Sequence, residues 1–481
     1  MKHKFSTNLA NYPVLLLALA LGLGFSSCEW FKPARDTKND KVVTEDDIGE
    51  IQGKKVYDPL TGTWRIVREV NGKVDTVHWR ELPEESYPPI TSDGSWANVN
   101  GNAGGLPNAS GETHTISILL PFLAQGYQPA TVNDNSLWAL HFYGGAKLAY
   151  QDLEKEGVHL DVSVLDSDGS GSRLRKLMNE APLQKAELII GPYKRDNVML
   201  VEPFTKTRHK ALVVPYTASM GLATADPGYI QVNPSLKSHC EAIARHARAN
   251  YNTEDIVLVA RSKDAERSRL AYFQEANAAI EGNRDSSFRE YIVGNPMGEV
   301  METELDSFIR PGKTNVFIVP SWSNEGFVYS LLRQLMVKQS EGEEIVVYGM
   351  PQWMNFEQID YDFYEKLHVH VSSASYIDYD DERIRQFRKK FFDTYGTIPR
   401  EEAFTGYDIM RYFGKMLDKW GAEFPAKIDR EPFDVLHGRF DFERVVLEPE
   451  KHREDLNYYD QLENKFVHIL EFRDYHFQLA D

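Results

Sequence analysis

From about residue 114 onward, short apolar segments alternate with longer segments whose apolar residues recur at helical spacing. The short segments are continuous runs of Val, Ile and Leu, which is typical of parallel strands covered on both faces. The pattern predicts strands at 115–121, 160–165, 187–190, 211–215, 256–260, 290–293, 315–319 and 344–348. It predicts helices at 136–156, 172–179, 198–208, 238–251, 267–280, 299–309 and 325–337.

The alternation falls into two series, and the second begins with the helix predicted at 238–251. Short buried strands that alternate with amphipathic helices form doubly wound sheets. The sequence therefore predicts the α/β class, with two doubly wound parallel-sheet lobes. In such sheets, ligands bind at the carboxyl ends of the strands.

Composition narrows the functional classes. The chain has 481 residues with 24 Tyr, 25 Phe and 8 Trp, too many aromatic side chains for a wholly disordered protein. Its net charge of −18 argues against a nucleic-acid partner. Two cysteines, Cys28 and Cys240, are too few for a disulfide scaffold, and we expect Cys240 to be a buried free thiol in the helix at 238–251.

The N-terminal segment indicates the compartment. Two lysines precede an apolar run at 14–25 that ends in two serines and Cys28, and this run is too short to span a bilayer. Residues 1–28 resemble a bacterial lipoprotein signal peptide, in which Cys28 carries palmitate or a similar acyl chain and becomes the mature N-terminus. The alternative is an ordinary signal peptide followed by an incidental cysteine. We expect a lipid-anchored protein of the bacterial cell envelope that faces the periplasm, on the outer membrane or alternatively the inner one.

Residues 29–112 are predicted to form a polar tether and linker. Within them, the segment 56–82 predicts a β-hairpin, because strand-like runs at 63–70 and 74–79 flank the turn signal Asn71-Gly72. Two strands alone are marginally stable in water, so we expect this hairpin to dock elsewhere.

No set of catalytic residues stands out. The segment 166–171 begins like a calcium loop, but Leu177 stands where the bidentate Glu belongs, so we expect a strand-to-helix turn there. His368 and His370 could share one face of a strand, yet no metal-binding motif accompanies them. Serine-nucleophile and nucleotide-binding motifs are missing as well. We therefore expect no enzymatic activity, no metal and no cofactor.

A resemblance to a known family rests on motifs between residues 114 and 481. Residues 186–192 (Ala-Glu-Leu-Ile-Ile-Gly-Pro) resemble the type I periplasmic solute-binding proteins of the leucine/isoleucine/valine-binding branch. In that family, a strand ending in Gly-Pro precedes a helix whose N-terminus faces the cleft between two lobes. Further motifs follow in the family's order at 116–121, 144–149, 213–215, 230–235, 256–260, 391–399, 403–408, 438–442 and 467–472.

The resemblance implies two lobes that are joined by three crossings and close on a small ligand about a hinge. It implies that residues 113–232 and 374–432 form the first lobe, and that residues 233–373 and 433–481 form the second.

The same resemblance implies a ligand-binding site between the lobes. The residues expected there are Tyr193, Lys194, Arg195, Tyr216, Thr217 and Ser219 from the first lobe, with Glu266, Trp322, Asn324 and Trp353 from the second. Residues 349–353 replace the acid that holds the ligand's ammonium group in the family, which disfavours a branched-chain amino acid. Lys194 and Arg195, near a helix N-terminus, favour an anionic or otherwise amino-acid-like ligand. The alternative is that they are ordinary surface charges.

Two functions remain open from the sequence. The first is a solute-binding lipoprotein that captures a small molecule for import by an ABC transporter permease, or for sensing. The second is an interaction module, without a transport role, that regulates a cell-envelope enzyme or assembly, with the hairpin at 56–82 as its docking arm.

Overall fold

The computed structural model describes residues 54–58, 63–67, 112–124, 134–280, 286–294, 302–452 and 458–480. The chain divides into two compact units, Met1–Glu81 and Leu82–Asp481. In the first unit, β1 (Lys54–Asp58) pairs with β2 (Thr63–Val67) in an antiparallel hairpin. Strand β2 lies within the first expected strand at 63–70, and its described partner is β1. The expected turn at Asn71-Gly72 and the expected strand at 74–79 lie outside the described residues.

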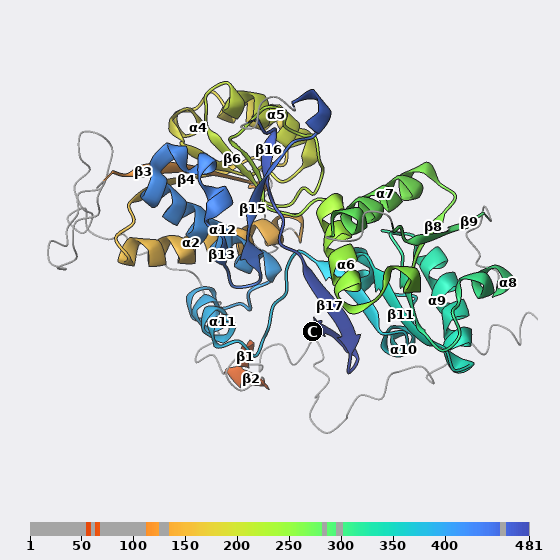
Figure 1. Cartoon of the computed structure of the whole chain (residues 1–481). Helices are drawn as coiled ribbons and strands as arrows, with labels where there is room; N and C mark the ends of the chain where they lie inside the picture. Colours follow the sequence, from red (N-terminus) through yellow and green to blue (C-terminus); the bar gives the residue numbers. More distant parts are fainter. Residues whose placement is uncertain are drawn as a thin grey trace, which may run out of the picture. The chain divides into compact units, whose positions relative to one another are not determined.

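The second unit contains two seven-stranded sheets, which confirms the predicted α/β class with two lobes (Figure 1). The first sheet is parallel from β4 to β16, and β15 is antiparallel at its edge. Its strands, in spatial order, are β4 (Leu160–Asp166), β3 (His114–Leu120), β5 (Leu188–Ile190), β6 (Ala211–Val214), β7 (Tyr229–Gln231), β16 (Gln461–Asn464) and β15 (Phe442–Val445).

The second sheet is parallel from β9 to β12 and ends in an antiparallel hairpin. Its strands, in spatial order, are β9 (Arg289–Val293), β8 (Ile256–Arg261), β10 (Thr314–Ile318), β11 (Glu344–Gly349), β12 (Val369–Ser373), β17 (His468–Arg473) and β18 (His476–Leu479). A separate two-residue ladder joins β13 (Phe433–Asp434) to β14 (Arg439–Phe440).

Helices flank both sheets (Figure 1). The first lobe contains α2 (Asp134–Lys155), α3 (Gly171–Leu177), α4 (Ala181–Lys185), α5 (Arg195–Lys206), α11 (Glu382–Tyr395) and α12 (Glu401–Trp420). The second lobe contains α6 (Leu236–Asn250), α7 (Asp264–Ala279), α8 (Glu302–Leu305), α9 (Glu325–Ser340) and α10 (Tyr361–Lys366). Short 3-10 helices are η5 (Thr253–Asp255), η6 (Asp306–Phe308), η7 (Pro351–Asn355), η8 (Gly421–Ala426), η9 (Ile428–Arg430) and η10 (Pro449–Lys451).

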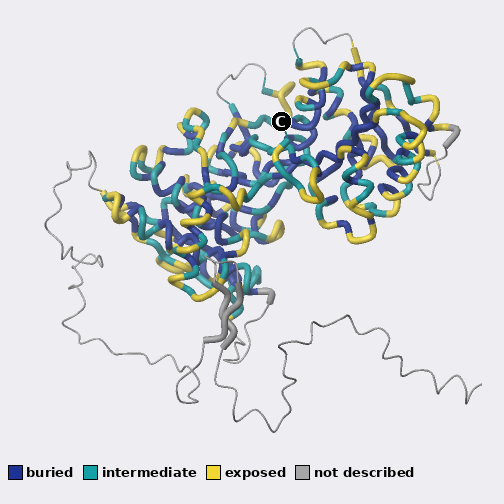
Figure 2. The backbone as a smooth tube through the Cα atoms, turned by 90° about the horizontal axis from the view of Figure 1, so that it is seen from below, coloured by how far each residue is buried: buried dark blue, intermediate teal, exposed yellow. Residues whose placement is uncertain are grey.

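The apolar runs form strands because both of their faces are buried. In β3, Ile116 and Ile118 join the core beneath α2 and α12, while Leu119 joins the core beneath α3 and α5. Successive side chains of a strand point to opposite faces, so a strand between two helix layers needs apolar residues at every position. Figure 2 shows buried residues along the inside of the fold, with exposed residues around them.

The structure corrects the expected boundary at residue 433. Strands β15 and β16 belong to the first sheet, and the second sheet receives only β17 and β18 from the C-terminal part of the chain. The reason is that Leu462 of β16 aligns with Ile230 of β7, and Phe442 and Leu462 are buried in the first-lobe core. The final crossing between the lobes therefore lies between β16 and β17.

Residues 382–420 return to the first lobe, where α12 crosses α2 at very short range. A Cβ atom on Gly145 would lie 1.8 Å from the carbonyl oxygen of Ala403, and one on Gly406 would lie 2.0 Å from that of Phe142. Only glycine at both positions lets the two backbones approach this closely.

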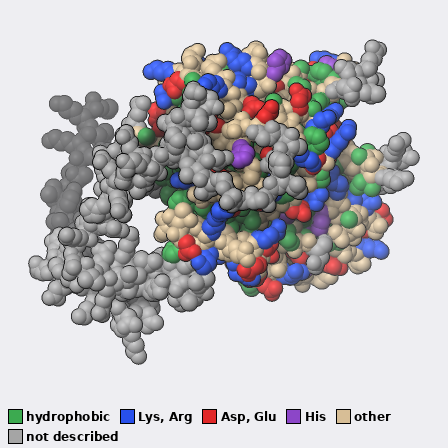
Figure 3. Space-filling view, turned by 90° about the vertical axis from the view of Figure 1, so that its left-hand side faces the viewer, with side chains coloured by type: hydrophobic (Ala, Val, Ile, Leu, Met, Phe, Trp, Pro, Cys, Tyr) green, Lys and Arg blue, Asp and Glu red, His purple; other side chains and the backbone are tan. Residues whose placement is uncertain are grey.

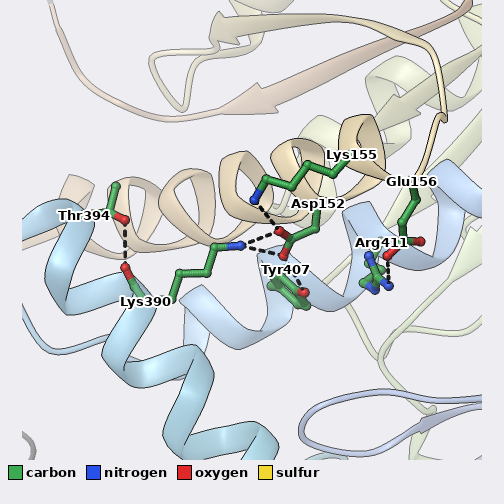
Figure 4. Close-up of polar contacts among 7 residues, drawn as sticks. All are labelled: Asp152, Lys155, Glu156, Lys390, Thr394, Tyr407 and Arg411. Carbon is green, nitrogen blue, oxygen red and sulfur yellow. Dashed lines mark hydrogen bonds and ion pairs between the residues drawn. The ribbon is translucent and has the colours of Figure 1, made fainter. Parts of the chain in front are cut away.

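Asp152 of α2 links three helices (Figure 4). Its carboxylate accepts hydrogen bonds from Lys390 Nζ of α11, at 2.5 and 2.6 Å, and from the Tyr407 hydroxyl of α12, at 3.0 Å. One turn further along, Glu156 pairs with Arg411 at 2.5 Å. Burial opposes ionisation of Asp152, but the hydrogen bonds from Lys390 and Tyr407 outweigh it and lower the pKa of this carboxyl.

We expect Asp152→Asn to reduce the free energy of unfolding by about 1–3 kcal/mol at pH 7, because charged hydrogen bonds to two helices are lost. Since the folded pKa is lowered, the carboxylate stabilises the protein above the ordinary Asp pKa of about 3.9, and this contribution disappears as pH falls through the folded value. Urea unfolding of both proteins at several pH values measures the difference.

The control is Asp393→Asn on α11, which breaks an exposed pair with Lys389 four residues away and should change stability by less than about 0.5 kcal/mol. Equal effects of the two substitutions would contradict a linking role for Asp152.

Candidate functional site

The first-lobe site is built where β3, β4, β5 and β6 end along one edge of the sheet. The carboxylate of Asp166, the last residue of β4, organises the loop that follows β3. It accepts hydrogen bonds from the backbone amides of Phe122 and Ala124, both at 2.9 Å, and from that of Asp168 at 2.8 Å. Asp166 is therefore satisfied by backbone amides, in agreement with the expected strand-to-helix turn rather than a calcium loop.

An aromatic cluster of Trp138, Tyr193 and Tyr216 lies at this edge. Trp138, in the first turns of α2, stands between the other two, with ring centroids 4.6 Å from Tyr193 and 5.5 Å from Tyr216. Tyr193 follows β5 and Tyr216 follows β6, so neighbouring strands place them side by side. The cluster thus brings together two expected site residues. It adds Trp138, which lies in the helix predicted at 136–156 and was not among the expected site residues.

Lys194 and Arg195 follow Tyr193 at the N-terminus of α5, and both are exposed. Lys194 Nζ lies 5.6 Å from the centre of the Tyr193 ring. A Cβ atom placed on Gly169 would lie 3.6 Å from the same Nζ, which puts the ammonium group beside the loop between β4 and α3. A positive charge at a helix N-terminus, next to aromatic rings, is suited to an anionic group on an organic molecule.

The hydroxyl residues of the β6 loop lie next to Tyr216. Thr217 is buried and its Oγ1 accepts a hydrogen bond from the Ser219 amide at 3.3 Å, while Ser219 is half-buried. The carbonyl oxygen of Tyr216 accepts a hydrogen bond at 2.9 Å from the side chain of Asn233, which follows β7. The first lobe therefore presents six expected site residues from two adjacent strand ends.

The second lobe supplies fewer groups than expected. Trp322 follows β10, is half-buried and packs edge-on against His239 of α6, with ring centres 6.2 Å apart. Asn324 caps α9, and its Oδ1 accepts a hydrogen bond from the Phe327 amide at 2.8 Å. The side-chain oxygen of Asn324 is thus already used within its own helix.

Two expected ligand residues of the second lobe are instead structural. Glu266 is 4% exposed and binds the guanidinium of Arg261. It also accepts a hydrogen bond from the Arg261 amide at 3.0 Å. Trp353 is 0% exposed, and its indole donates to the carbonyl oxygen of Ser321 at 2.9 Å. Both side chains satisfy their polar atoms inside the lobe, so the structure removes them from the candidate site.

His239 is a residue that the sequence analysis missed. It is 3% exposed beside Trp322, and its Nδ1 has no hydrogen-bond partner among the described residues. Burial lowers the pKa of His239 to about 4, so the ring is neutral near pH 7. Its position in the first turn of a helix after a crossing is the sequence signal that could have identified it.

A buried carboxylate joins the lobes near this point. Glu463 of β16 is 0% exposed and accepts hydrogen bonds from the Ser235 amide at 2.9 Å and the Ser238 hydroxyl at 2.6 Å. Lys465 pairs with the other carboxylate oxygen at 3.1 Å. Ser235 caps α6, the first helix of the second lobe. This contact therefore ties the first crossing of the chain to the last.

The remaining candidate groups are structural. Among the side chains that the structure describes, no cluster of three or more His, Cys, Asp or Glu is arranged to hold a metal ion. His370 is buried and bonds through Nδ1 to the backbone oxygen of His368, at 2.7 Å. Cys240 is confirmed as a buried free thiol, and burial raises its pKa to about 12. Within the described part of the chain, no helix has the length and apolarity needed to cross a bilayer.

Comparison with solved structures shows which known fold this chain shares. A protein of Rhodospirillum rubrum, assigned to the branched-chain amino acid ABC transporters, superposes with a TM-score of 0.55 at 15% identity, over 76% of this chain and 100% of that one. The fold is that of the type I periplasmic binding proteins. A branched-chain amino acid ABC transporter periplasmic ligand-binding protein of Burkholderia xenovorans superposes with a TM-score of 0.51 at 12% identity, over 76% and 94% of the two chains. No protein-family model and no curated protein matches the sequence.

Positive and negative side chains are intermixed on one face of the described residues. Figure 3 shows Lys and Arg interspersed with Asp and Glu over the face of the molecule turned to the viewer. A type I periplasmic binding fold with such a face has no broad basic surface there for a nucleic-acid backbone.

We expect Glu266→Gln to lower the free energy of unfolding by about 2–4 kcal/mol, because it breaks a buried ion pair and leaves Arg261 without a partner. The control is Glu275→Gln in the same helix, which removes an exposed pair with Lys237 and should cost less than about 1 kcal/mol. Denaturant unfolding of the two variants checks this. A Glu266 variant as stable as the wild type would return this carboxylate to the list of ligand-binding candidates.

Proposed function

We propose that this protein is a lipid-anchored solute-binding protein of the bacterial cell envelope, which captures a small molecule at the carboxyl ends of its first-lobe strands for import or sensing. The observation that carries the proposal is the cluster of Trp138, Tyr193 and Tyr216 beside Lys194. Ligand sites are largely apolar and aromatic, with a few polar groups that fix orientation, and they form at strand carboxyl ends in doubly wound folds.

The chemistry of the cluster defines the ligand class. Trp138 and Tyr193 supply flat apolar surface, Lys194 supplies a positive charge, and Thr217 and Ser219 supply hydroxyls. This set suits an organic molecule that carries a carboxylate or similar anion together with an apolar body. The Rhodospirillum and Burkholderia proteins are both assigned to branched-chain amino acid transport. An amino-acid-like ligand also has a carboxylate and an apolar body, so it belongs to this ligand class. Glu266 is paired with Arg261 and cannot bind the ammonium group of such a ligand.

A second candidate function follows from the second lobe, in which several expected ligand-binding side chains are engaged in internal contacts. Glu266 and Trp353 are engaged inside the lobe, and the Asn324 side-chain oxygen caps a helix. A protein that no longer encloses a ligand needs no free polar groups at this edge. This observation favours the alternative of an interaction module that regulates an envelope enzyme or assembly.

Native mass spectrometry of the purified protein separates the two functions. A small molecule that co-purifies at one per chain supports solute binding. That molecule is then titrated calorimetrically into the wild type, Trp138→Ala and Lys194→Met. We expect Trp138→Ala to weaken binding about thirtyfold and Lys194→Met about tenfold, because an aromatic anchor contributes more than a charge at the rim.

The matched control is Lys147→Met, which removes an exposed lysine of α2 away from the cluster and should leave affinity within about twofold of the wild type. Unchanged affinity in both site variants would move the site elsewhere. The absence of any bound molecule would leave the interaction module as the better candidate.

The lipid anchor is tested at Cys28, which lies outside the described residues. We expect Cys28→Ser to release the protein from the membrane fraction, because several acyl chains on one residue anchor a protein stably. Fractionation shows the location, and intact-mass analysis of the wild type shows the acyl chains. A variant that stays with membranes, together with a wild type that carries no acyl mass, would exclude this anchor.

A further inference from the structure

A second surface of chemical interest lies on the second lobe, away from the first-lobe cluster. It is an open depression of about 760 Å³ between η7, the start of α10 and the turn between β17 and β18. The residues of its lining that matter here are Met354, Phe356, Glu357, Asp360, Tyr361 and Tyr475. We call it the tyrosine–acid depression.

The two tyrosines are exposed although they are firmly positioned. Tyr361 is 54% exposed and Tyr475 is 60% exposed, among the most exposed large side chains of the described residues. Tyr361 packs against Phe472, with ring centres 5.4 Å apart, and the Tyr475 hydroxyl donates to Asp362 Oδ1 at 2.9 Å. Their rings are therefore held at the surface in fixed positions rather than folded into the core.

The turn that carries Tyr475 is held in an unusual backbone conformation. Asp474 and Tyr475 have φ angles of 55° and 61°, a left-handed region that a bulky side chain rarely adopts. Glu365 of α10 accepts hydrogen bonds from both of their amides, at 3.2 and 3.1 Å. A glycine or asparagine would occupy such a turn with less strain, so the aromatic ring stands at this exposed point despite its conformational cost.

The charged side chains that line the depression are all acidic, and Lys366 nearby is paired with Asp362 at 3.5 Å. Glu357 and Asp360 line the depression, both are exposed, and neither forms an ion pair with any of the described residues. The lining contains no Lys or Arg. Asp360 caps α10, where its Oδ1 accepts a hydrogen bond from the Asp362 amide at 2.9 Å, but it has no counter-charge among the described residues. Aromatic faces and carboxylates without a counter-charge both attract cations, by quadrupole and by charge respectively.

The shape of the depression favours a cationic protein side chain over a free small cation. Small-molecule sites enclose most of their ligand, whereas this depression is open to solvent along its length. An open aromatic surface with acidic groups is suited to a cationic side chain that belongs to a larger molecule, such as a protein. Arginine matches it best, because a guanidinium stacks on aromatic rings and binds carboxylates in two places at once.

We propose that the tyrosine–acid depression docks an arginine- or lysine-bearing segment of a partner protein. This surface is separate from the first-lobe cluster. The β17–β18 turn lies beyond the amino end of β12, because β17 runs antiparallel to β12 and passes its first residue. The inference therefore goes beyond the proposed ligand site and does not depend on it.

The probe is a fluorescently labelled tetra-arginine peptide, blocked at both ends and titrated into the full chain at about 0.15 M salt, where weak long-range attraction is screened. We expect Tyr361→Ala to weaken binding at least fivefold, since an aromatic–cation contact contributes about 0.5–2 kcal/mol. Glu357→Gln should weaken it at least threefold.

Two matched controls separate this surface from the overall negative charge of the chain. Tyr379→Ala removes a 57% exposed tyrosine of the first lobe, and Glu254→Gln removes one carboxylate elsewhere on the second lobe. Both should bind the peptide within about twofold of the wild type.

Every other outcome would overturn the proposal. If all four variants bind like the wild type, only net charge attracts the peptide. If tetramethylammonium displaces the peptide at micromolar concentration, the depression holds a small cation rather than a protein segment. If sedimentation shows a dimer that Tyr361→Ala dissociates, the surface serves a second copy of this chain.

Discussion

The fold depends on one buried carboxylate, Glu463. It lies on β16, the last strand of the first lobe, and its partners Ser235 and Ser238 lie at the start of α6, the first helix of the second lobe. A carboxylate that is 0% exposed is tolerated only where hydrogen bonds and a counter-charge replace water, and Lys465 completes that set. Because the first and last crossings share these contacts, the lobes are joined at this point, where β16 pairs with β7 of the first sheet.

The same carboxylate explains where sequence reasoning succeeded and where it failed. Strands such as β8 were predictable, because burial on both faces demands a continuous apolar run, and Ile256–Ala260 form one. Strand β16 reads Gln-Leu-Glu-Asn, yet all four residues are buried. Glu463 and Asn464 are buried there because partners distant in the sequence form hydrogen bonds with them, and no local pattern reports such partners. The lobe boundary at 433 was wrong for this reason.

The candidate site divides in a similar way. Sequence position after a strand predicts which edge of the sheet a residue lies on, and at that edge Tyr193 and Tyr216 both contact Trp138. Position does not predict whether a side chain turns outward or inward. Glu266 lies five residues after Arg261 and pairs with it across the start of α7, while Trp353 packs over Gly349, where a Cβ atom would lie 2.4 Å from its ring. Both interactions are local and strong, and both remove a group that the strand order alone would give to a ligand.

The two lobes consequently differ in where exposed aromatic and charged side chains lie. In the first lobe, aromatic rings and an exposed ammonium group gather at the carboxyl ends of the strands. In the second lobe, several polar groups at that edge are satisfied internally, whereas Tyr475, Glu357 and Asp360 remain exposed around the tyrosine–acid depression. A polar group that is already paired gains little from a new partner, while an exposed aromatic ring beside an unpaired carboxylate gains both apolar burial and charge. The two proposals therefore rest on different lobes: the proposed small-molecule site on the first, and the proposed docking surface on the second.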